Sequence, residues 1–244
     1  MTVHHAHGEG CFCFDRRSVL GLAALAAAGG VLASRQASAQ SLSKAERDAM
    51  TPDQVIAMMR DGNARFRAGT PKQRDWLGQQ RASAAGQFPA AVLLSCIDSR
   101  APAEVILDLG IGDVFNSRIA GNVQDVAVLG GMEFACRLAG AKVVLVMGHT
   151  ACGAVAGAIA GAELGNLTAL LAKIRPAVAA TTFAGDRSAG NPAFVDAVAR
   201  QSVLMTVASI RRDSPVLAEM EQKREIRIVG SMYDLATGEV AFLG

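Results

Sequence analysis

Three side chains of the kind that bind transition metals occur in two short motifs. Cys96 begins the run C-I-D-S-R at residues 96–100, and the run G-H-T-A-C-G at residues 148–153 holds His149 and Cys152. His149 is the only histidine that follows residue 39. Two thiolates and one imidazole form a Cys₂His set, a known catalytic zinc pattern that leaves a fourth position open for water or another ligand. The motifs therefore predict a zinc site built by Cys96, His149 and Cys152.

Taken singly, each of these side chains has an ordinary structural explanation. A lone buried cysteine usually packs as a small apolar side chain, and a lone histidine at a turn is usually hydrogen-bonded. Cys136 is the comparison within the chain, because it lies in a helical pattern at residues 131–138 with no metal-binding neighbour. We interpret Cys136 as a core thiol. The cysteines that follow residue 39 are odd in number, which argues against a simple disulfide framework.

Two continuous apolar segments position the candidate ligands. Residues 91–95 (A-V-L-L-S) precede the first motif and residues 143–147 (V-V-L-V-M) precede the second, and such runs are typical of strands buried on both faces. The Ala-rich stretch 154–160 predicts a tightly packed helix after the second motif. Open α/β sheets bind ligands at the carboxyl ends of their strands. We therefore expect an α/β fold in which two strands bring the three ligands to one edge of the sheet.

Asp98 and Arg100 follow Cys96 closely enough to act at the same site. A guanidinium beside a carboxylate keeps the carboxylate ionised and oriented. Near zinc, Asp98 has two possible roles: it occupies the fourth position and excludes water, or Arg100 holds it aside to accept a hydrogen bond from zinc-bound water or hydroxide. The plain alternative is a surface ion pair, which contributes at most about 1 kcal/mol.

The first 39 residues differ from the rest and resemble a signal peptide. Arg16 and Arg17 precede an apolar run from Val19 to Ala33, and the A-S-A sequence at residues 37–39 is typical of a cleavage site. Paired arginines at this place indicate the twin-arginine export machinery. We expect residues 40–244 to form one catalytic domain that is periplasmic or secreted; an uncleaved membrane anchor is the alternative.

Composition excludes some classes of partner. Lysine and arginine together number 24 and the acidic residues 22, so the net charge is only +2, and no basic block is interleaved with aromatic residues. This pattern gives no indication of nucleic-acid binding. We also expect no stable membrane insertion once the leader is cleaved.

The two metal motifs and their spacing resemble the signature of the β-carbonic anhydrases. Weaker matches surround them: D-G-N-A-R-F at residues 61–66, the segment 112–122, and the segment 233–240. The resemblance implies a mostly parallel central sheet flanked by helices. It also implies a dimer with the active site at the subunit interface, and such dimers commonly pair into tetramers.

The resemblance further implies a reaction and a role for each site residue. The reaction is the reversible hydration of CO₂ to bicarbonate and a proton by zinc-bound hydroxide. Cys96, His149 and Cys152 correspond to the zinc ligands, with Asp98 as a possible fourth ligand, and Asp98 and Arg100 correspond to the catalytic dyad. Gln87 and the backbone N–H of Gly153 correspond to substrate contacts, and Gln87 is expected to serve the neighbouring subunit's zinc.

Three other functions remain open at this point. A hydrolase of CS₂ or COS with the same fold would use the same ligands. A non-catalytic module that binds zinc or bicarbonate would result if Asp98 never left the metal. A thiolate loop of the sulfurtransferase or phosphatase kind is disfavoured, because Cys96 and Arg100 are too close together and no Gly-rich backbone surrounds them.

Overall fold

The computed structural model describes residues 40–243. The export signal predicted for residues 1–39 lies outside the described residues. In chain order the elements are α2 (Lys44–Ala49), α3 (Pro52–Arg67), α4 (Trp76–Ser83), β1 (Ala91–Ser95), α5 (Ala103–Ile106), β2 (Val114–Arg118), the 3₁₀ turn η1 (Ala120–Asn122), α6 (Val126–Glu133), the π-helical turn η2 (Phe134–Leu138), β3 (Val143–His149), α7 (Gly153–Ala160), α8 (Gly165–Ala172), α9 (Arg175–Ala180), α10 (Pro192–Asp213), α11 (Pro215–Gln222), β4 (Arg227–Tyr233) and β5 (Val240–Leu243).

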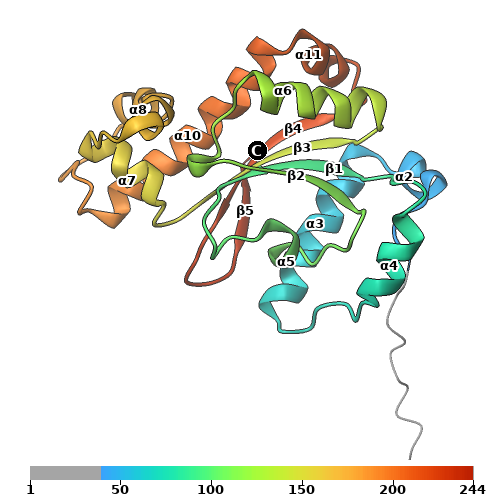
Figure 1. The fold of residues 1–244 in the computed structure, drawn as a ribbon. Helices are drawn as coiled ribbons and strands as arrows, with labels where there is room; N and C mark the ends of the chain where they lie inside the picture. The colour runs from blue at the N-terminus through green and yellow to red at the C-terminus, as the bar shows by residue number, and fades with distance from the viewer. Residues whose placement is uncertain (1–39, 244) are drawn as a thin grey trace, which may run out of the picture. The chain divides into compact units, whose positions relative to one another are not determined.

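The strands form one five-stranded sheet in the order β2-β1-β3-β4-β5 (Figure 1). The first four strands are parallel, and β5 runs antiparallel to β4 as the second strand of a C-terminal hairpin. The predicted strand at residues 91–95 is confirmed as β1, and the strand predicted from residue 143 extends two residues further, to His149. The predicted mostly parallel α/β sheet is therefore confirmed.

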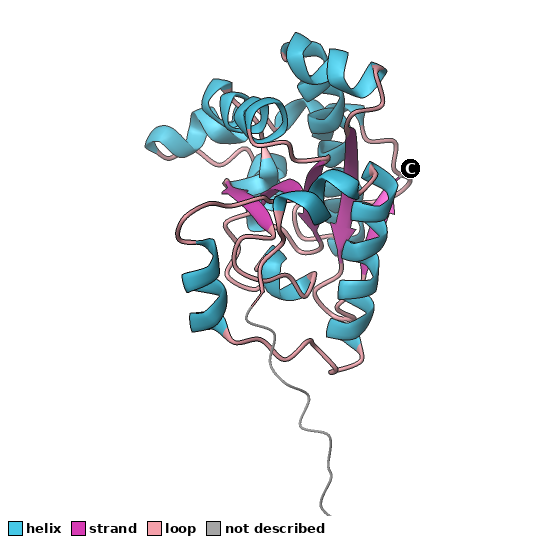
Figure 2. Ribbon diagram, turned by 90° about the vertical axis from the view of Figure 1, so that its right-hand side faces the viewer, coloured by secondary structure: helices cyan, strands magenta, loops and turns pink. Residues whose placement is uncertain are grey.

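Helices cover both faces of the sheet, as Figures 1 and 2 show. Alternate residues of β1 point to opposite faces, because successive side chains of a strand do so. Val92 and Leu94 pack in a cluster that includes Val203 of α10, whereas Leu93 packs in another that includes Met59 of α3. Burial on both faces explains why β1 and β3 are apolar at nearly every position.

The helix predicted around Cys136 is present, but it is not a regular α-helix. Its first part is α6, which Asp125 caps by accepting from the amides of Ala127 and Val128, each at 3.0 Å. The last turn, η2, has π-helical hydrogen bonding. Apolar periodicity predicts that a helix is present but does not distinguish these two patterns over a single turn, because their backbone hydrogen bonds differ in span by only one residue.

α10 is the longest described helix, and by its length and composition alone it is long and apolar enough to cross a bilayer. Half of that stretch is buried inside the protein, where it packs on β3 and β4. Its apolar face is therefore accounted for by the core.

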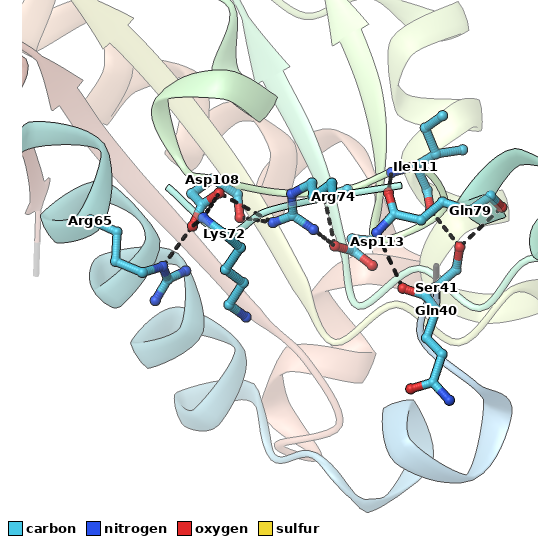
Figure 3. A network of polar contacts seen from close by, with 10 residues as sticks. Gln40, Ser41, Arg65, Lys72, Arg74, Gln79, Asp108, Ile111 and Asp113 are labelled. Carbon is cyan, nitrogen blue, oxygen red and sulfur yellow. Dashed lines mark hydrogen bonds and ion pairs between the residues drawn. The ribbon is translucent and has the colours of Figure 1, made fainter. Parts of the chain in front are cut away.

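A polar network ties the chain before β1 to the loop between α5 and β2 (Figure 3). Its centre is Asp108, whose carboxylate lies 2.6 Å from Arg65 Nε and 3.3 Å from Arg74 Nη2, and which also accepts from the backbone N–H of Lys72. Asp108 has a left-handed backbone (φ 48°). Burial alone would raise the pKa of Asp108, but the Arg65 guanidinium and the Lys72 amide lower it below its usual value.

The same network continues toward the start of the described chain (Figure 3). Asp113 accepts from the Gly110 amide at 2.7 Å, and Gln79 accepts from the Ile111 amide at 3.2 Å. Ser41 donates to the Ile111 carbonyl at 2.8 Å. Buried polar groups are therefore satisfied here, and the segment before β1 is fixed against the sheet's loops.

Candidate metal centre

The three predicted ligands meet at one edge of the sheet. Ser95 of β1 pairs with Met147 of β3, so both metal motifs emerge from adjacent parallel strands at the same level. Cys96 follows β1 directly, His149 ends β3, and Cys152 precedes the first residue of α7. The ligand atoms of these three side chains all lie within 4.8 Å of one another. The predicted convergence is confirmed.

The cluster is buried. The exposed fractions of Cys96, His149 and Cys152 are 4%, 1% and 1%. Both cysteines belong to an apolar cluster that includes Val155 of α7 and Phe194 of α10. Charge interactions are strong in such surroundings, because little water screens them.

His149 is oriented for metal binding through Nε2. Its Nδ1 lies 2.8 Å from the carbonyl oxygen of Thr150, so Nδ1 carries the hydrogen when the ring is neutral and Nε2 presents its lone pair. His149 Nε2 is buried and has no hydrogen-bond partner among the described residues. An unpartnered buried nitrogen costs free energy, and a metal ion at this position would satisfy it.

Contact between the two ligand thiols shifts their pKa values in opposite directions. The pKa of Cys96 is lowered to about 4, chiefly because the Cys152 thiol donates to its sulfur. The pKa of Cys152 is raised above its usual range by the Cys96 thiolate and by burial. Two thiolates this close are stable together only beside a cation, and a zinc ion provides that charge. The donor set therefore fits zinc with a fourth position free.

Asp98 and Arg100 form a two-point ion pair beside the cluster. Arg100 Nε lies 3.0 Å from Asp98 Oδ1, Nη2 lies 2.8 Å from Oδ2, and the Arg100 amide also donates to Oδ1 at 2.9 Å. These bonds hold the pKa of the Asp98 carboxyl well below its usual range. Asp98 Oδ2 lies 3.9 Å from His149 Nε2. The carboxylate is therefore ionised and next to the metal position, while Arg100 engages both its oxygens.

Arg118 and Gly121 also act on the first motif, and motif spacing alone assigns them no role. Arg118 of β2 donates to the backbone carbonyls of Cys96 at 3.0 Å and of Asp98 at 2.6 Å. The Gly121 amide donates to the Cys96 sulfur at 3.4 Å. Arg118 fixes the loop that carries a ligand and the acid, and Gly121 stabilises the Cys96 thiolate. The sequence signal is the R-I-A-G-N run at 118–122, which belongs to the weaker matches.

Gln87 and Gly153 occupy very different places. Gln87 is exposed in the loop that precedes β1, where it lines a surface hollow with Ser83 and Gly112. Gln87 precedes the start of β1 and Cys96 follows its end, and the strand itself spans roughly 16 Å at the usual rise per residue. The described protomer therefore does not bring Gln87 to its own metal cluster. Gly153 is the first residue of α7, and a Cβ built on it would meet nothing within 4 Å.

Cys136 lies apart from the cluster, as predicted. It is 2% exposed, and the cluster of candidate ligands does not include it. Burial raises the pKa of the Cys136 thiol to about 12. A neutral, buried thiol is a core residue and not a metal ligand.

Comparison with known proteins gives consistent results. The model of the family described as carbonic anhydrase matches residues 91–240. Carbonic anhydrase 2 of Mycobacterium tuberculosis is 37% identical over 182 residues, which cover 74% of this chain and 87% of that protein.

Solved structures show the same fold. A crystal structure of a β-carbonic anhydrase from Aspergillus fumigatus has a TM-score of 0.62 and 28% identity, and the match covers 78% of this chain and 89% of that one. A tetrameric β-carbonic anhydrase from Sordaria macrospora has a TM-score of 0.59 and 25% identity, with 69% and 91% covered. Together with the buried Cys96–His149–Cys152 cluster, these matches show that the chain belongs to the carbonic anhydrase family, in its β class.

Proposed function

We propose that this carbonic anhydrase is an exported enzyme that hydrates CO₂ reversibly to bicarbonate and a proton, with Asp98 and Arg100 as its catalytic dyad. The observation that carries the proposal is the buried cluster of Cys96, His149 and Cys152 beside a carboxylate that Arg100 engages at both oxygens. When bound, zinc lowers the pKa of a coordinated water from about 15.7 toward 7 and so supplies a nucleophile near neutral pH.

Asp98 is assigned the task of orienting the attacking water. Its pKa lies well below the usual range because of Arg100, so it accepts hydrogen bonds throughout the neutral range. Oδ2 lies 3.9 Å from His149 Nε2, which supports its role as an acceptor beside the fourth position of the metal. Release of Asp98 by Arg100 would let the carboxylate take that position itself, which is the closed, inactive alternative.

The Gly153 amide is assigned to substrate oxygen. It is the first N–H of α7, and the first N–H groups of a helix lack an intrahelical partner. The helix N-terminus also favours negative charge, which develops on CO₂ as it becomes bicarbonate. The open space around Gly153 is compatible with a small ligand there.

We assign Gln87 to the zinc site of a second copy of the chain. Gln87 is exposed and roughly a strand's length from its own cluster. The helix that precedes it, α4, exposes Trp76 and Leu77 by 54% and 68%, which is typical of a surface covered by a partner. The tetrameric relative from Sordaria macrospora makes pairing of such dimers a reasonable further expectation.

Export by the twin-arginine machinery remains a proposal from the leader sequence. Replacing Arg16 and Arg17 together by lysine is expected to leave the enzyme in the cytoplasm, as assayed by cell fractionation. Unchanged periplasmic enzyme would contradict the route.

The substrate is tested by assaying CO₂ hydration and the hydrolysis of COS and CS₂ on one zinc-assayed sample. The proposal expects CO₂ hydration to be the fast reaction. Fast COS or CS₂ hydrolysis with slow hydration would favour the hydrolase. Bound zinc without any of these reactions would favour the non-catalytic module.

A further inference from the structure

The turn that separates His149 from Cys152 contains a residue in an unfavourable conformation. Ala151 has φ 51°, which lies in the left-handed region that residues with a Cβ rarely adopt. Two metal ligands flank this residue, so its backbone angles set the spacing between them. A conformation of this kind persists only where surrounding contacts stabilise it.

Asp196 of α10 supplies one such contact from outside the turn. Its Oδ1 accepts from the backbone N–H of Ala151 at 2.8 Å. The two residues are 45 positions apart in sequence. Neighbouring residues of α10, including Phe194 and Val198, pack in the same apolar cluster as Cys152, so the helix that carries Asp196 is fixed relative to the ligand.

The other end of Ala151 contacts the catalytic dyad. Its carbonyl accepts from Arg100 Nη2 at 3.5 Å, and the same nitrogen donates to Asp98. Ala151 thus stands between Asp196 and Arg100, with a hydrogen bond on each side. A change in the backbone angles of Ala151 would alter the distance between the two ligands. It would also move the Ala151 carbonyl, which helps to orient Arg100.

The residue before Ala151 is held independently. The Thr150 amide donates to the Tyr233 carbonyl at 3.0 Å, and Thr150 Oγ1 accepts from the Leu235 amide at 3.0 Å. The C-terminal hairpin therefore fixes Thr150. The carbonyl of Thr150 in turn accepts from Nδ1 of His149 and orients that ring. Asp196 is the described side chain that fixes the Ala151 amide.

We propose that Asp196 is a positioning residue that holds Ala151 in its left-handed turn and thereby sets the geometry of the His149 and Cys152 ligands and of Arg100. The inference rests on the zinc site of the proposed function, but it does not depend on which small molecule is hydrated. It adds a residue of α10 to a site otherwise built from the two motif loops and β2.

The test uses Asp196→Ala and Asp196→Asn, with zinc replaced by Co²⁺ for absorption spectroscopy and with zinc release to a chelating dye measured separately. Loss of an outer partner of a metal site typically weakens metal binding 10- to 100-fold. We expect Asp196→Ala to release zinc about tenfold faster and to shift the Co²⁺ bands. Asp196→Asn is expected to stay near the wild type, because its side-chain oxygen still accepts.

Asp186→Ala is the matched control, since Asp186 also accepts from a backbone amide, that of Ser188 at 3.0 Å, in a loop that contains neither metal motif. It should leave both readouts unchanged. An Asp196→Ala protein with wild-type spectrum and release rate, even if less stable, would overturn the inference. Failure of the wild type itself to bind zinc would instead contradict the proposed function.

A second pair of variants addresses the turn directly and covers the case in which Asp196→Ala does not fold. Glycine adopts the left-handed conformation freely. In an Ala151→Gly background, Asp196→Ala should therefore fold and change the release rate less than it does next to alanine. A double variant altered as strongly as Asp196→Ala, or unable to fold, would show that Asp196 does not act through this turn.

Discussion

Two buried polar clusters in this molecule differ in how completely their polar and charged groups are paired. Around Asp108, the carboxylate is matched by Arg65, Arg74 and a backbone amide, and the pairing is complete (Figure 3). Around His149, a buried nitrogen has no partner among the described residues, and contact between the two thiols lowers the pKa of Cys96 and raises that of Cys152. The ion pairs of the first cluster neutralise one another and stabilise loops, whereas the second presents buried donor atoms that a bound cation would satisfy.

Both clusters also contain a left-handed residue that is not glycine. Asp108 has φ 48° and Ala151 has φ 51°. At Asp108 the strain lies within a fixed loop that performs no chemistry. At Ala151 it lies between two metal ligands, where a small change of backbone changes the site. The Asp108 cluster therefore contributes to stability and the metal cluster to function. Variants in the first cluster should change the free energy of unfolding, and variants in the second should change zinc binding and the rate.

The largest effect is expected from Cys96→Ser. The variant removes one of three ligands from a buried set, so zinc binding and CO₂ hydration should be lost together, and the rate should fall to the uncatalysed level. Metal analysis and stopped-flow hydration on the same sample measure both. Circular dichroism should show a folded chain, because the sheet and its helices do not depend on this sulfur. A variant that keeps zinc and rate would contradict the assignment.

Asp108→Ala should affect stability and not chemistry. Removing the carboxylate takes the ion-pair partner from the partly exposed Arg65 and leaves the buried Arg74 with Asp113, 3.8 Å away, as its remaining carboxylate, at a cost of about 2 kcal/mol of unfolding free energy. Urea denaturation measures this cost. Zinc content and the rate per folded molecule should not change. Glu219→Ala, which breaks an exposed pair with Lys223, is the control and should change little.

The pH dependence of that stability follows from the sign of the shift. The pKa of Asp108 is lower in the folded chain, so its contribution is complete above the usual carboxyl pKa. The contribution is lost as the pH falls through the folded value. Asp108→Ala should therefore flatten the acid side of the stability curve, and a curve unchanged at low pH would contradict the role of this network.

Asp98→Asn should keep zinc and lower the rate by about a hundredfold, the range typical of a lost acid–base group. We expect the wild-type rate to rise between pH 7 and pH 8.5, because a zinc-bound water would be more fully ionised at the higher pH. The closed form needs the carboxylate, so this rise should become shallower in the variant. The control is Asp213→Asn, because Arg212 makes the same two-point contact with Asp213 on the surface. Arg212 Nε and Nη2 donate to the two oxygens of Asp213, each at 2.7 Å. An equal effect of the two variants would remove Asp98 from the mechanism.

Gln87→Ala should have the smallest effect on the isolated protein, a higher KM with unchanged zinc content. Mixing it with Cys96→Ser subunits sharpens the test. If Gln87 serves a neighbour, a mixed dimer contains one site with an intact zinc set and an intact Gln87, so KM should return toward the wild-type value. If the mixture has the same KM as Gln87→Ala alone, Gln87 does not contribute to the zinc site of a neighbouring subunit.

The sequence predicts the metal cluster well because its determinants are local. Continuous apolar runs identify β1 and β3, and each run ends directly at a ligand motif. The roles of Arg118 and Asp196 are not predictable in this way, since each reaches its target across the tertiary structure.

The sequence pattern also does not predict two local backbone conformations. No glycine marks the left-handed turn at Ala151, and apolar periodicity does not distinguish the π-helical turn η2 from α-helix. The Asp108 network draws on residues from several separate segments, so no motif reveals it. The role that we propose for Gln87 involves a second chain, so the local sequence around Gln87 does not identify the site that it would serve.

The most direct test of zinc-dependent catalysis is stopped-flow CO₂ hydration by the purified protein at pH near 7 and near 8.5, with zinc determined on the same sample. We predict one zinc per chain and fast hydration that is lost with the metal and is faster at the upper pH. One bound zinc with no hydration at either pH would contradict it.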